Sequence, residues 1–439
     1  MTRGAVTSSE TVEGAHAPLS GAAGRFDGVG QAVLAMRGQP LRTFLLCLFV
    51  WTFVNLEQSL FGYAVPEMIK EFGVDVKVIG FVISIGFACA IVGAIVTGIL
   101  TDRYGRRRSL VGCFSISSFF YAMQGFAPGI ASLAASRSLG AGFSAGLSPV
   151  TNSYVAEVAP PRIRALVVGF LQIGFPLGWF LASLLVVPLM AAFGWRAIFM
   201  ASLVGPLLSW LIYRSLQETE RFKAVEAVAA NRRSWRAQLG ELMKPGARRL
   251  TLLCIMAFFT KGGAYAGLAF FLPTFLHEVR GYDTANAAQI IGYSYGIGIF
   301  GYLSASIVGE FFLSRKTTIV IWCWLGALAL VYFIWFPQSM TEDIIACGVM
   351  AIFSFGTSAI LTTFVLEQFP TRLRATGASC ASASVSLGFA LLPMVVGSLV
   401  GQYGWQWTIT ICVTPLLFLS GIAVLGMRNV RAGEEMTDI

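Results

Sequence analysis

Long apolar stretches alternate with short polar segments from residue 43 almost to the end of the chain. Runs such as 77–100 and 249–276 exceed the roughly 20 apolar residues needed to cross a bilayer. Because backbone groups within lipid need hydrogen-bond partners inside their own segment, each stretch is predicted to be a helix. The pattern therefore predicts an all-α polytopic membrane protein with twelve transmembrane spans, at 43–65, 77–100, 108–128, 131–157, 164–191, 195–215, 249–277, 286–312, 317–337, 342–366, 376–400 and 405–427.

A polar segment rich in Lys, Arg and Glu separates the sixth span from the seventh and divides the spans into two groups of six. The first 40 residues are rich in Gly, Ala and Ser and lack an apolar core, so they are predicted to be a tail rather than a signal peptide. The expected organisation is a cytoplasmic tail at 1–42, a six-helix bundle at 43–216, a cytoplasmic linker at 217–248, a second six-helix bundle at 249–428 and a cytoplasmic tail at 429–439.

Composition excludes several classes of protein. Hydrophobic residues make up 56% of the 439 residues and charged residues 12%, about half the charge of a soluble globular protein. A water-soluble enzyme, a disordered protein and a nucleic-acid-binding domain are therefore excluded. All eight cysteines lie in apolar segments without metal-binding spacing, and there are two histidines, so we expect no disulfide, no metal and no cofactor.

The net charge of +9 has to be interpreted by location. If the N-terminus is cytoplasmic, most of the 31 Lys and Arg residues fall in the tails and in the loops on the inner side. The outer loops then hold four, and two more lie within spans. Because basic residues mark the cytoplasmic loops of membrane proteins, the termini are predicted to be cytoplasmic. The positive charge is thus a topology signal, and it implies no nucleic-acid partner.

The two groups of six contain a repeat. The segment that begins at Glu157 and runs through Pro160, Arg162 and Arg164 to Ala165 recurs 210 residues later, as Glu367, Pro370, Arg372, Arg374 and Ala375. Both copies follow the fourth span of their group. Parallel six-helix repeats are the layout of a large class of secondary transporters, whose binding site lies near the middle of the membrane between the halves.

The loop between the second and third spans, residues 98–108, resembles the signature loop of the major facilitator superfamily. Residues 137–149 and 157–164 resemble the superfamily's fourth-helix motif and the loop after it. The resemblance implies two six-helix bundles related by a pseudo-two-fold axis. It also implies a cytoplasmic latch that holds the halves together in the outward-open state; the alternative is that these residues serve only topology and packing. The predicted latch residues are Gly98, Asp102, Gly105, Arg106, Glu157, Arg164, Glu367 and Arg374.

Two charges are predicted within the spans of the first half. Glu57 lies about 22 Å of helix beyond Arg42, and a carboxylate at that depth is a functional candidate. Arg137 lies at a similar depth on the fourth span, and an acid and an arginine so placed resemble the proton-coupling pair of several symporters. Protonation of Glu57 would free Arg137 to bind an anionic substrate. The alternatives are a hydrogen-bonded Glu57 that joins helices and an Arg137 that reaches the outer surface.

Lys261 lies about 18 Å into the seventh span, near the middle of the membrane. No deep acidic residue in the second half is available to pair with it, so we expect it to face an aqueous cavity and bind a substrate carboxylate. The alternative is a hydrogen-bond network without a ligand. Aromatic and amide side chains are further candidates for substrate contact, with packing as the alternative for each of them: Asn55, Gln58, Gln172, Trp179, Tyr265, Tyr293 and Tyr295.

One acid and two basic residues in the spans favour an anionic cargo. The sequence therefore predicts a proton-coupled symporter that imports a small organic anion through the plasma membrane, such as a bacterial inner membrane, as a monomer. Within the superfamily the chain looks most like the metabolite:proton and aromatic-acid:proton symporter groups. The alternatives are a proton-driven exporter, an uncoupled facilitator and a transporter-like sensor. An intramembrane enzyme is disfavoured because the spans hold no HExxH, GxSxG or acidic dyad.

Overall fold

The computed structural model describes residues 34, 36–160, 163–217, 242–369 and 374–429, and every regular element among them is a helix. The helices of the N-terminal half are α2 (Gln39–Phe72), α3 (Val76–Tyr104), α4 (Arg106–Met123), η1 (Gln124–Phe126), α5 (Ile130–Ser144), α6 (Leu147–Val158), α7 (Arg164–Leu171), α8 (Gly174–Phe193), α9 (Trp195–Met200), η2 (Ala201–Leu203) and α10 (Val204–Ser215). Most of the expected linker and both expected tails lie outside the described residues.

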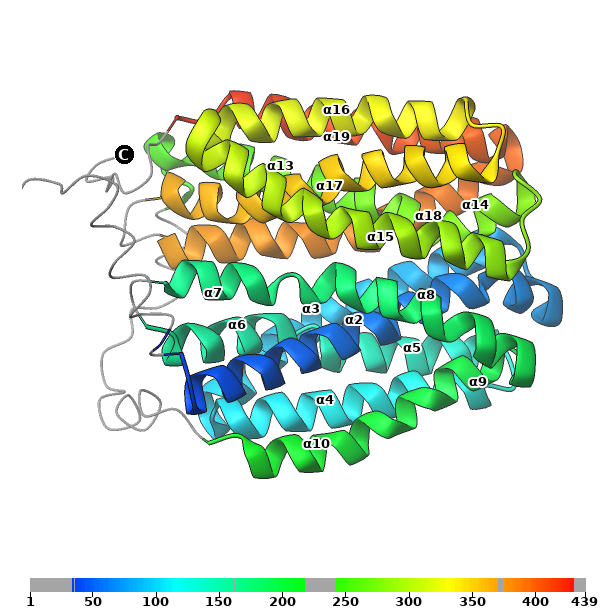
Figure 1. Cartoon of the computed structure of the whole chain (residues 1–439), viewed down its shortest axis with the longest axis horizontal. Helices are drawn as coiled ribbons and strands as arrows, with labels where there is room; N and C mark the ends of the chain where they lie inside the picture. The colour runs from blue at the N-terminus through cyan, green and yellow to red at the C-terminus, as the bar shows by residue number, and fades with distance from the viewer. Residues whose placement is uncertain (1–33, 35, 161–162, 218–241, 370–373, 430–439) are drawn as a thin grey trace, which may run out of the picture.

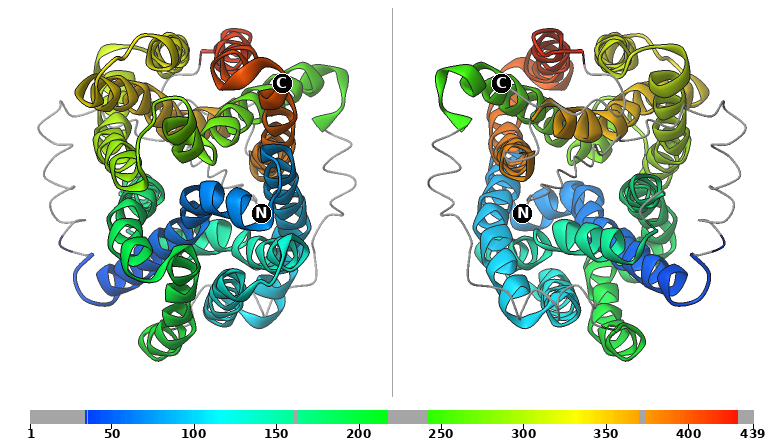
Figure 2. Two further views of the ribbon diagram at one scale, coloured as in Figure 1. Left: turned by 90° about the vertical axis from the view of Figure 1, so that its right-hand side faces the viewer. Right: turned by 90° about the vertical axis from the view of Figure 1, so that its left-hand side faces the viewer.

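The helices of the C-terminal half follow the same order. They are α13 (Pro245–Ala269), α14 (Leu272–Glu278), α15 (Thr284–Ile307), η3 (Val308–Phe312), α16 (Arg315–Trp335), α17 (Met340–Gln368), α18 (Arg374–Cys412) and α19 (Thr414–Leu425). Figure 2 shows the two halves facing each other, each as a group of helices seen end-on.

Among the described residues the twelve predicted membrane crossings are present, but several are broken. Prolines explain three of the breaks, because proline lacks the N–H of the i→i−4 bond and its ring clashes with the preceding turn. The third position is a proline in three helices: Pro149 in α6, Pro176 in α8 and Pro206 in α10. Each therefore begins a new helix inside a span that the sequence pattern predicts as continuous.

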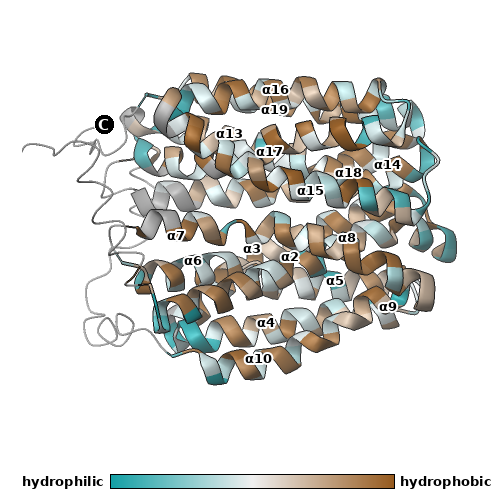
Figure 3. Cartoon of the chain, in the orientation of Figure 1, coloured by the Kyte–Doolittle hydropathy of each residue, from teal (hydrophilic) through white to brown (hydrophobic). Residues whose placement is uncertain are grey.

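In the described part of the chain, nine segments are individually long and apolar enough to cross a membrane. The last of these, Cys380–Leu425, covers two crossings, because α18 continues through a kink at Gly404. Two further crossings, α4 with η1 and α5 with α6, are not among these segments. Figure 3 shows hydrophobic residues along the length of the helices and hydrophilic residues at the two ends. The protein is a multi-pass membrane protein.

One end of the bundle carries the basic segments at residues 103–108 and 315–316, and we call it the basic end; it lies to the left in Figure 1. The opposite end carries the junctions at residues 73–75, 194, 279–283 and 336–339.

The two halves pack against each other toward the opposite end. There α3 contacts α18 and α8 contacts α15, and the Ser84 hydroxyl accepts a hydrogen bond of 3.1 Å from the backbone N–H of Met394. The largest buried cluster combines apolar residues of both halves. Two smaller clusters each belong to a single half. The halves are therefore closed against each other at the opposite end and separated toward the basic end.

Each half is braced at the opposite end by a tryptophan. The Trp195 indole N–H donates to the Glu71 carboxylate at 2.6 Å, and Trp405 donates to Glu278 at the same distance. Trp195 and Trp405 are 210 residues apart, and each follows a glycine of positive φ. The repeat found in the sequence at the basic end thus continues at the opposite end, where the sixth crossing of each half is tied to the first.

We expect Trp195→Phe and Trp405→Phe to destabilise the protein by similar amounts, about 1 kcal/mol each, because each removes a hydrogen bond to a carboxylate and keeps an aromatic ring. Thermal unfolding of the purified protein in detergent measures the change. Trp407→Phe, at a side chain that is more than half exposed, is the control. Unchanged unfolding temperatures for both variants would contradict this role.

Candidate functional site

A cavity of about 240 Å³ lies between the halves, from the middle of the helices toward the basic end. It is lined by α2 and the α7–α8 region of one half and by α13, α15, α17 and α18 of the other. Among the described residues that line it, none is Asp or Glu, and Lys261 is the one charged residue. The lining is Trp51, Gln172, Phe175, Phe258, Lys261, Gly262, Tyr265, Tyr302, Phe355, Ser358, Leu361, Thr362, Val385 and Phe389.

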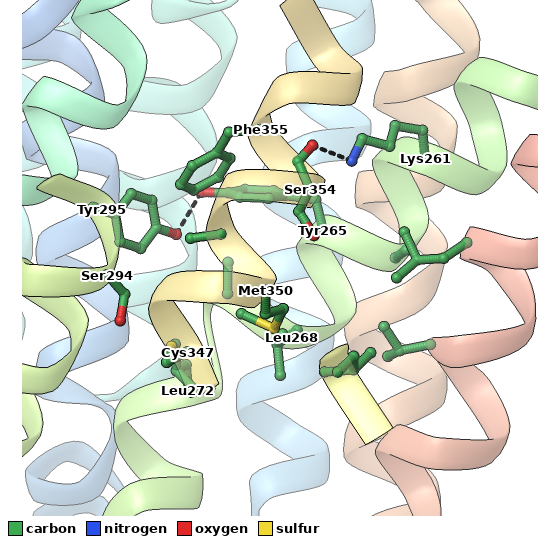
Figure 4. Close-up of a pocket in the computed structure, with 16 residues that line it drawn as sticks. Lys261, Tyr265, Leu268, Leu272, Ser294, Tyr295, Cys347, Met350, Ser354 and Phe355 are labelled. Carbon is green, nitrogen blue, oxygen red and sulfur yellow. Dashed lines mark hydrogen bonds between the residues drawn. The ribbon is translucent and has the colours of Figure 1, made fainter. Parts of the chain in front are cut away.

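Lys261 reaches this cavity from the middle of α13 and is 9% exposed. Its ammonium donates to the backbone carbonyl of Ser354 on α17 (Figure 4). An ammonium has three N–H donors, and no other hydrogen-bond acceptor or carboxylate partner is found for it in the part of the chain that the structure describes. A buried cation paired only with a neutral carbonyl favours the binding of an anion.

Aromatic side chains cover the cavity on the side of the opposite end. The hydroxyl groups of Tyr265 and Tyr295 lie 2.8 Å apart and share a hydrogen bond. The Trp179 ring stacks on Tyr295, with ring centres 5.0 Å apart and planes 7° apart. Because Trp179 and Tyr295 belong to different halves, this stack is one of the contacts that close the opposite end.

Arg137 lies deeper in the N-terminal half, on α5, and is 3% exposed. Its guanidinium carbon lies 3.8 Å from the centre of the Phe61 ring and 5.5 Å from that of Phe270. Its Nε and Nη1 atoms have no hydrogen-bond partner among the described residues. Arg137 therefore does not reach the outer surface, the alternative that the sequence left open, and its charge is held against aromatic faces.

Glu57 is 1% exposed and does not form an ion pair with Arg137 in this conformation. Its carboxyl group is directed toward the hydroxyl groups of Ser118 and Ser202, yet neither of its oxygen atoms completes a hydrogen bond within the described residues. Glu57 and Phe61 are one turn apart on α2. The Phe61 ring, and not the Glu57 carboxylate, lies beside the Arg137 guanidinium.

A second connection between Glu57 and Arg137 runs through Tyr121 on α4, which interacts electrostatically with both. Its hydroxyl lies 3.0 Å from the Ser144 hydroxyl, which also accepts from the Gln58 amide at 3.4 Å. Gly140 permits this arrangement, because a Cβ there would lie 2.9 Å from the Tyr121 ring. The predicted Gln58 thus belongs to a polar network inside the N-terminal half.

The remaining candidates divide between the cavity and its surroundings. Gln172 lines the cavity, and its side-chain oxygen is buried without a partner among the described residues. Asn55 donates to the Trp51 carbonyl at 2.7 Å and packs where α2 meets α8. Tyr293 is 54% exposed and lines none of the cavities found. Positions two residues apart on a helix face nearly opposite sides, and here Tyr295 is the one that faces inward. Substrate contact by Tyr293 stays a prediction.

The predicted latch residues lie at the basic end. Gly105 has a φ of 89° and is the single residue between α3 and α4, a backbone conformation that favours glycine. Arg106 pairs with Glu157 at 2.6 Å within the N-terminal half, and Arg315 pairs with Glu367 within the C-terminal half. These two ion pairs therefore brace each half separately in this conformation.

Four further predicted latch residues are Gly98, Asp102, Arg164 and Arg374. At Gly98, no atom lies within 4 Å of a Cβ built there in this conformation. The side chains of Asp102, Arg164 and Arg374 lie outside the described residues. The latch between the halves therefore stays a prediction for the conformation that is closed at the basic end.

Several cavity residues were missed by the sequence reasoning. Phe175, Phe355 and Phe389 face the cavity or its junctions, and Phe389 stacks on Tyr265 with ring centres 5.7 Å apart. They stand in long apolar runs among 35 phenylalanines, so no local signal separates a cavity-facing ring from a packed one.

Comparison with known proteins identifies relatives along most of the chain. The model of the family described as Major Facilitator Superfamily matches residues 47–377. The chain is 27% identical over 369 residues to a probable 4-methylmuconolactone transporter of Cupriavidus pinatubonensis, and the match covers 83% of each chain. It is 27% identical over 397 residues to the 3-(3-hydroxy-phenyl)propionate transporter of Escherichia coli, covering 89% of this chain and 94% of the other.

Among solved structures, the fold is similar to that of a D-xylose-proton symporter. The TM-score is 0.72 at 16% sequence identity, and the match covers 91% of this chain and 100% of the other. At this identity the similarity shows a common fold. The arrangement of the helices therefore has a counterpart of known structure.

Proposed function

The chain belongs to the Major Facilitator Superfamily, a family of membrane transporters and not of enzymes, and we propose that it is a proton-coupled symporter that imports a small organic anion. Transport follows alternating access, in which the central cavity opens to one side of the membrane and then to the other. With the basic end cytoplasmic, as the arginine distribution predicts, the conformation described above is open to the cytoplasm. It is the state in which an importer releases its cargo.

The observation that carries this proposal is Lys261 in the central cavity. The cavity has no acidic lining residue among those described, and its lysine has one neutral partner. A carboxylate bound there would accept charge-assisted hydrogen bonds from the ammonium. The aromatic rings around the cavity suit the body of an aromatic or alicyclic acid. A cationic cargo would meet repulsion from Lys261 without a compensating carboxylate.

The similar proteins point to the same class of cargo. The 3-(3-hydroxy-phenyl)propionate transporter is named for an aromatic carboxylic acid. Arg137 is the second candidate for anion binding, and it would reach the substrate once Phe61 and Phe270 move apart as the opposite end opens. Proton coupling is assigned to Glu57, the buried carboxyl group that is connected to Arg137 through Tyr121.

Uptake by proteoliposomes of purified protein tests the function. Radiolabelled carboxylates, sugars and amines are offered at two external pH values, with and without an inward proton gradient. We expect uptake of carboxylates alone, and faster uptake when the outside is acidic. Uptake of amines or sugars without uptake of carboxylates would overturn the proposal.

Lys261→Met tests the anion site. Loss of a charge-assisted hydrogen bond is expected to weaken carboxylate binding by about tenfold to a hundredfold, measured by isothermal titration calorimetry. Lys261→Arg should restore part of the affinity because it restores the charge. Lys316→Met, which removes a lysine bonded to the Met427 carbonyl at the basic end, is the matched control. Unchanged affinity in Lys261→Met would contradict the assignment.

A further inference from the structure

A second, smaller cavity lies inside the C-terminal half, next to the central one, and we call it the side cavity. Its volume is about 50 Å³, room for roughly three or four water-sized groups. Most of its lining is apolar and includes Leu268, Leu272, Leu330, Met350 and Leu417. Lys261, Tyr265 and Phe355 line both cavities, so the two adjoin at these three residues.

Lys261 stands at one end of the side cavity and the apolar floor at the other. Figure 4 shows the ammonium at the Ser354 carbonyl, with Leu272 and Cys347 at the far end and Leu268 and Met350 between them. From Lys261 to Leu268 is seven residues of helix, about 10 Å. The side cavity therefore combines a cationic mouth with an apolar interior.

Neither water nor the surrounding protein fills the apolar interior and also accepts hydrogen bonds from all the donors of Lys261. The lining also includes Tyr265, Tyr295 and Ser294, but the two tyrosine hydroxyls bond each other and the Ser294 hydroxyl donates to the Ile290 carbonyl. The mainly apolar remainder offers water few hydrogen-bond partners and tends to stay dry, and an empty apolar cavity costs packing contacts. At its mouth, Lys261 has donors beyond the one used by the Ser354 carbonyl. A ligand with an anionic group and an apolar group close together would satisfy both features at once.

We propose that the transported anion binds its carboxylate at Lys261 and inserts a short alkyl group into the side cavity, which sets its specificity. This inference rests on the proposed function and names the substrate class within it. The carboxylate lies at the junction of the two cavities. The carbon atom bonded to it therefore carries two substituents, one directed into each cavity. The ring or larger apolar body lies in the central cavity among Phe175, Tyr302 and Phe389. The substrate is therefore a carboxylic acid substituted next to the carboxylate by a ring and a short alkyl chain.

A series of acids that differ only in the alkyl group tests this. The probes are phenylacetate, 2-phenylpropionate, 2-phenylbutyrate, 2-phenylpentanoate and 2-phenylheptanoate, titrated into the full-length protein in nanodiscs. Affinity should rise roughly fourfold for each methylene that enters the side cavity, and should fall for the longest chain, which cannot fit. The two enantiomers of each chiral acid should differ in affinity, because exchanging ring and alkyl group places the ring in the smaller cavity.

Two variants change the side cavity in opposite directions. Ala351→Leu fills it and should abolish the gain from the alkyl group, so that the longer acids bind more weakly than in the wild type. Leu330→Ala enlarges it and should move the best chain length up by one or two carbon atoms. Leu330 lines the side cavity and does not line the central cavity. Leu328, on the same helix, is 58% exposed. Leu328→Ala is therefore the matched control and should leave the series unchanged.

The outcomes separate this inference from the proposed function. If carboxylates bind in a Lys261-dependent manner but affinity is independent of alkyl length, the side cavity is a packing void and the inference is overturned while the function stands. If Leu330→Ala leaves the length profile unchanged, the inference is overturned in the same way, even if Ala351→Leu fails to fold. If no carboxylate binding depends on Lys261, the proposed function itself fails.

Discussion

Glu57→Gln is expected to abolish uptake driven by a proton gradient while exchange of substrate across the membrane continues. The glutamine keeps the size and polarity of the side chain but cannot release a proton. Glu57 is 1% exposed, and its carboxyl oxygens have no hydrogen-bond partner within the described structure. A charged carboxylate in that position is costly, so the conformation described here is the one in which we expect Glu57 to be protonated.

Proteoliposomes loaded with substrate separate the two activities. Gradient-driven accumulation in Glu57→Gln should fall to the level seen without a gradient, and counterflow of labelled substrate should remain within a fewfold of the wild type. Glu67→Gln, on the same helix but beside a cleft at the opposite end, is the control and should accumulate substrate normally. Accumulation by Glu57→Gln that still responds to the gradient would show that the coupling assignment is wrong.

Gly80→Ala is expected to prevent full closure of the opposite end and to shift the protein away from the conformation described here. A Cβ at Gly80 would lie 2.5 Å from the backbone carbonyl oxygen of Pro393, and α3 and α18 are the helices that join the halves there. Backbone atoms cannot move aside as a flexible side chain would. Overpacking of this kind costs about 1–3 kcal/mol, which corresponds to a population shift of roughly fivefold to 150-fold.

Hydrogen–deuterium exchange of the purified protein measures the shift. Exchange should rise near residues 76–84 and 393–400 and fall in the part of α13 that faces the central cavity. Gly397→Ala, whose Cβ would lie 2.9 Å from the Val76 carbonyl, should act in the same direction from the other half. Gly112→Ala has no atom within 4 Å of the new Cβ and is the control. Equal exchange in Gly80→Ala and Gly112→Ala would argue against this closure contact.

The positions of the spans and the depth of their charges were accessible from the sequence. Lys261 could be placed near the middle of its span by counting residues, because helix rise is constant. Tyr293 and Tyr295 show where such counting stops: both have the same depth, and only packing against α8 and α17 decides which one faces inward. The helix breaks at the prolines of α5–α6 and α7–α8 were also not predicted from the sequence, because the apolar stretch continues across them.

The relation between Glu57 and Arg137 also could not be predicted from the sequence. Equal depth on neighbouring helices allows an ion pair, but the distance between two side chains depends on how each helix is rotated about its axis. Here Phe61 takes the place of a carboxylate beside the guanidinium, and Glu57 turns toward α4 and η2. The sequence could name both residues without showing that an aromatic ring lies beside the guanidinium or that Tyr121 interacts with both charged residues.

The sequence by itself determined the membrane class, the twelve crossings, the repeat of 210 residues and the charges that must be accounted for within the spans. These properties depend on the one-dimensional pattern of hydropathy and charge, which lipid imposes directly on each segment. The tertiary structure decided which end of the molecule is closed, which side chains share a cavity and that Lys261 stands at the junction of two cavities. Those depend on helix rotation and close packing between segments far apart in the chain, because one helix can present several faces without changing its hydropathy.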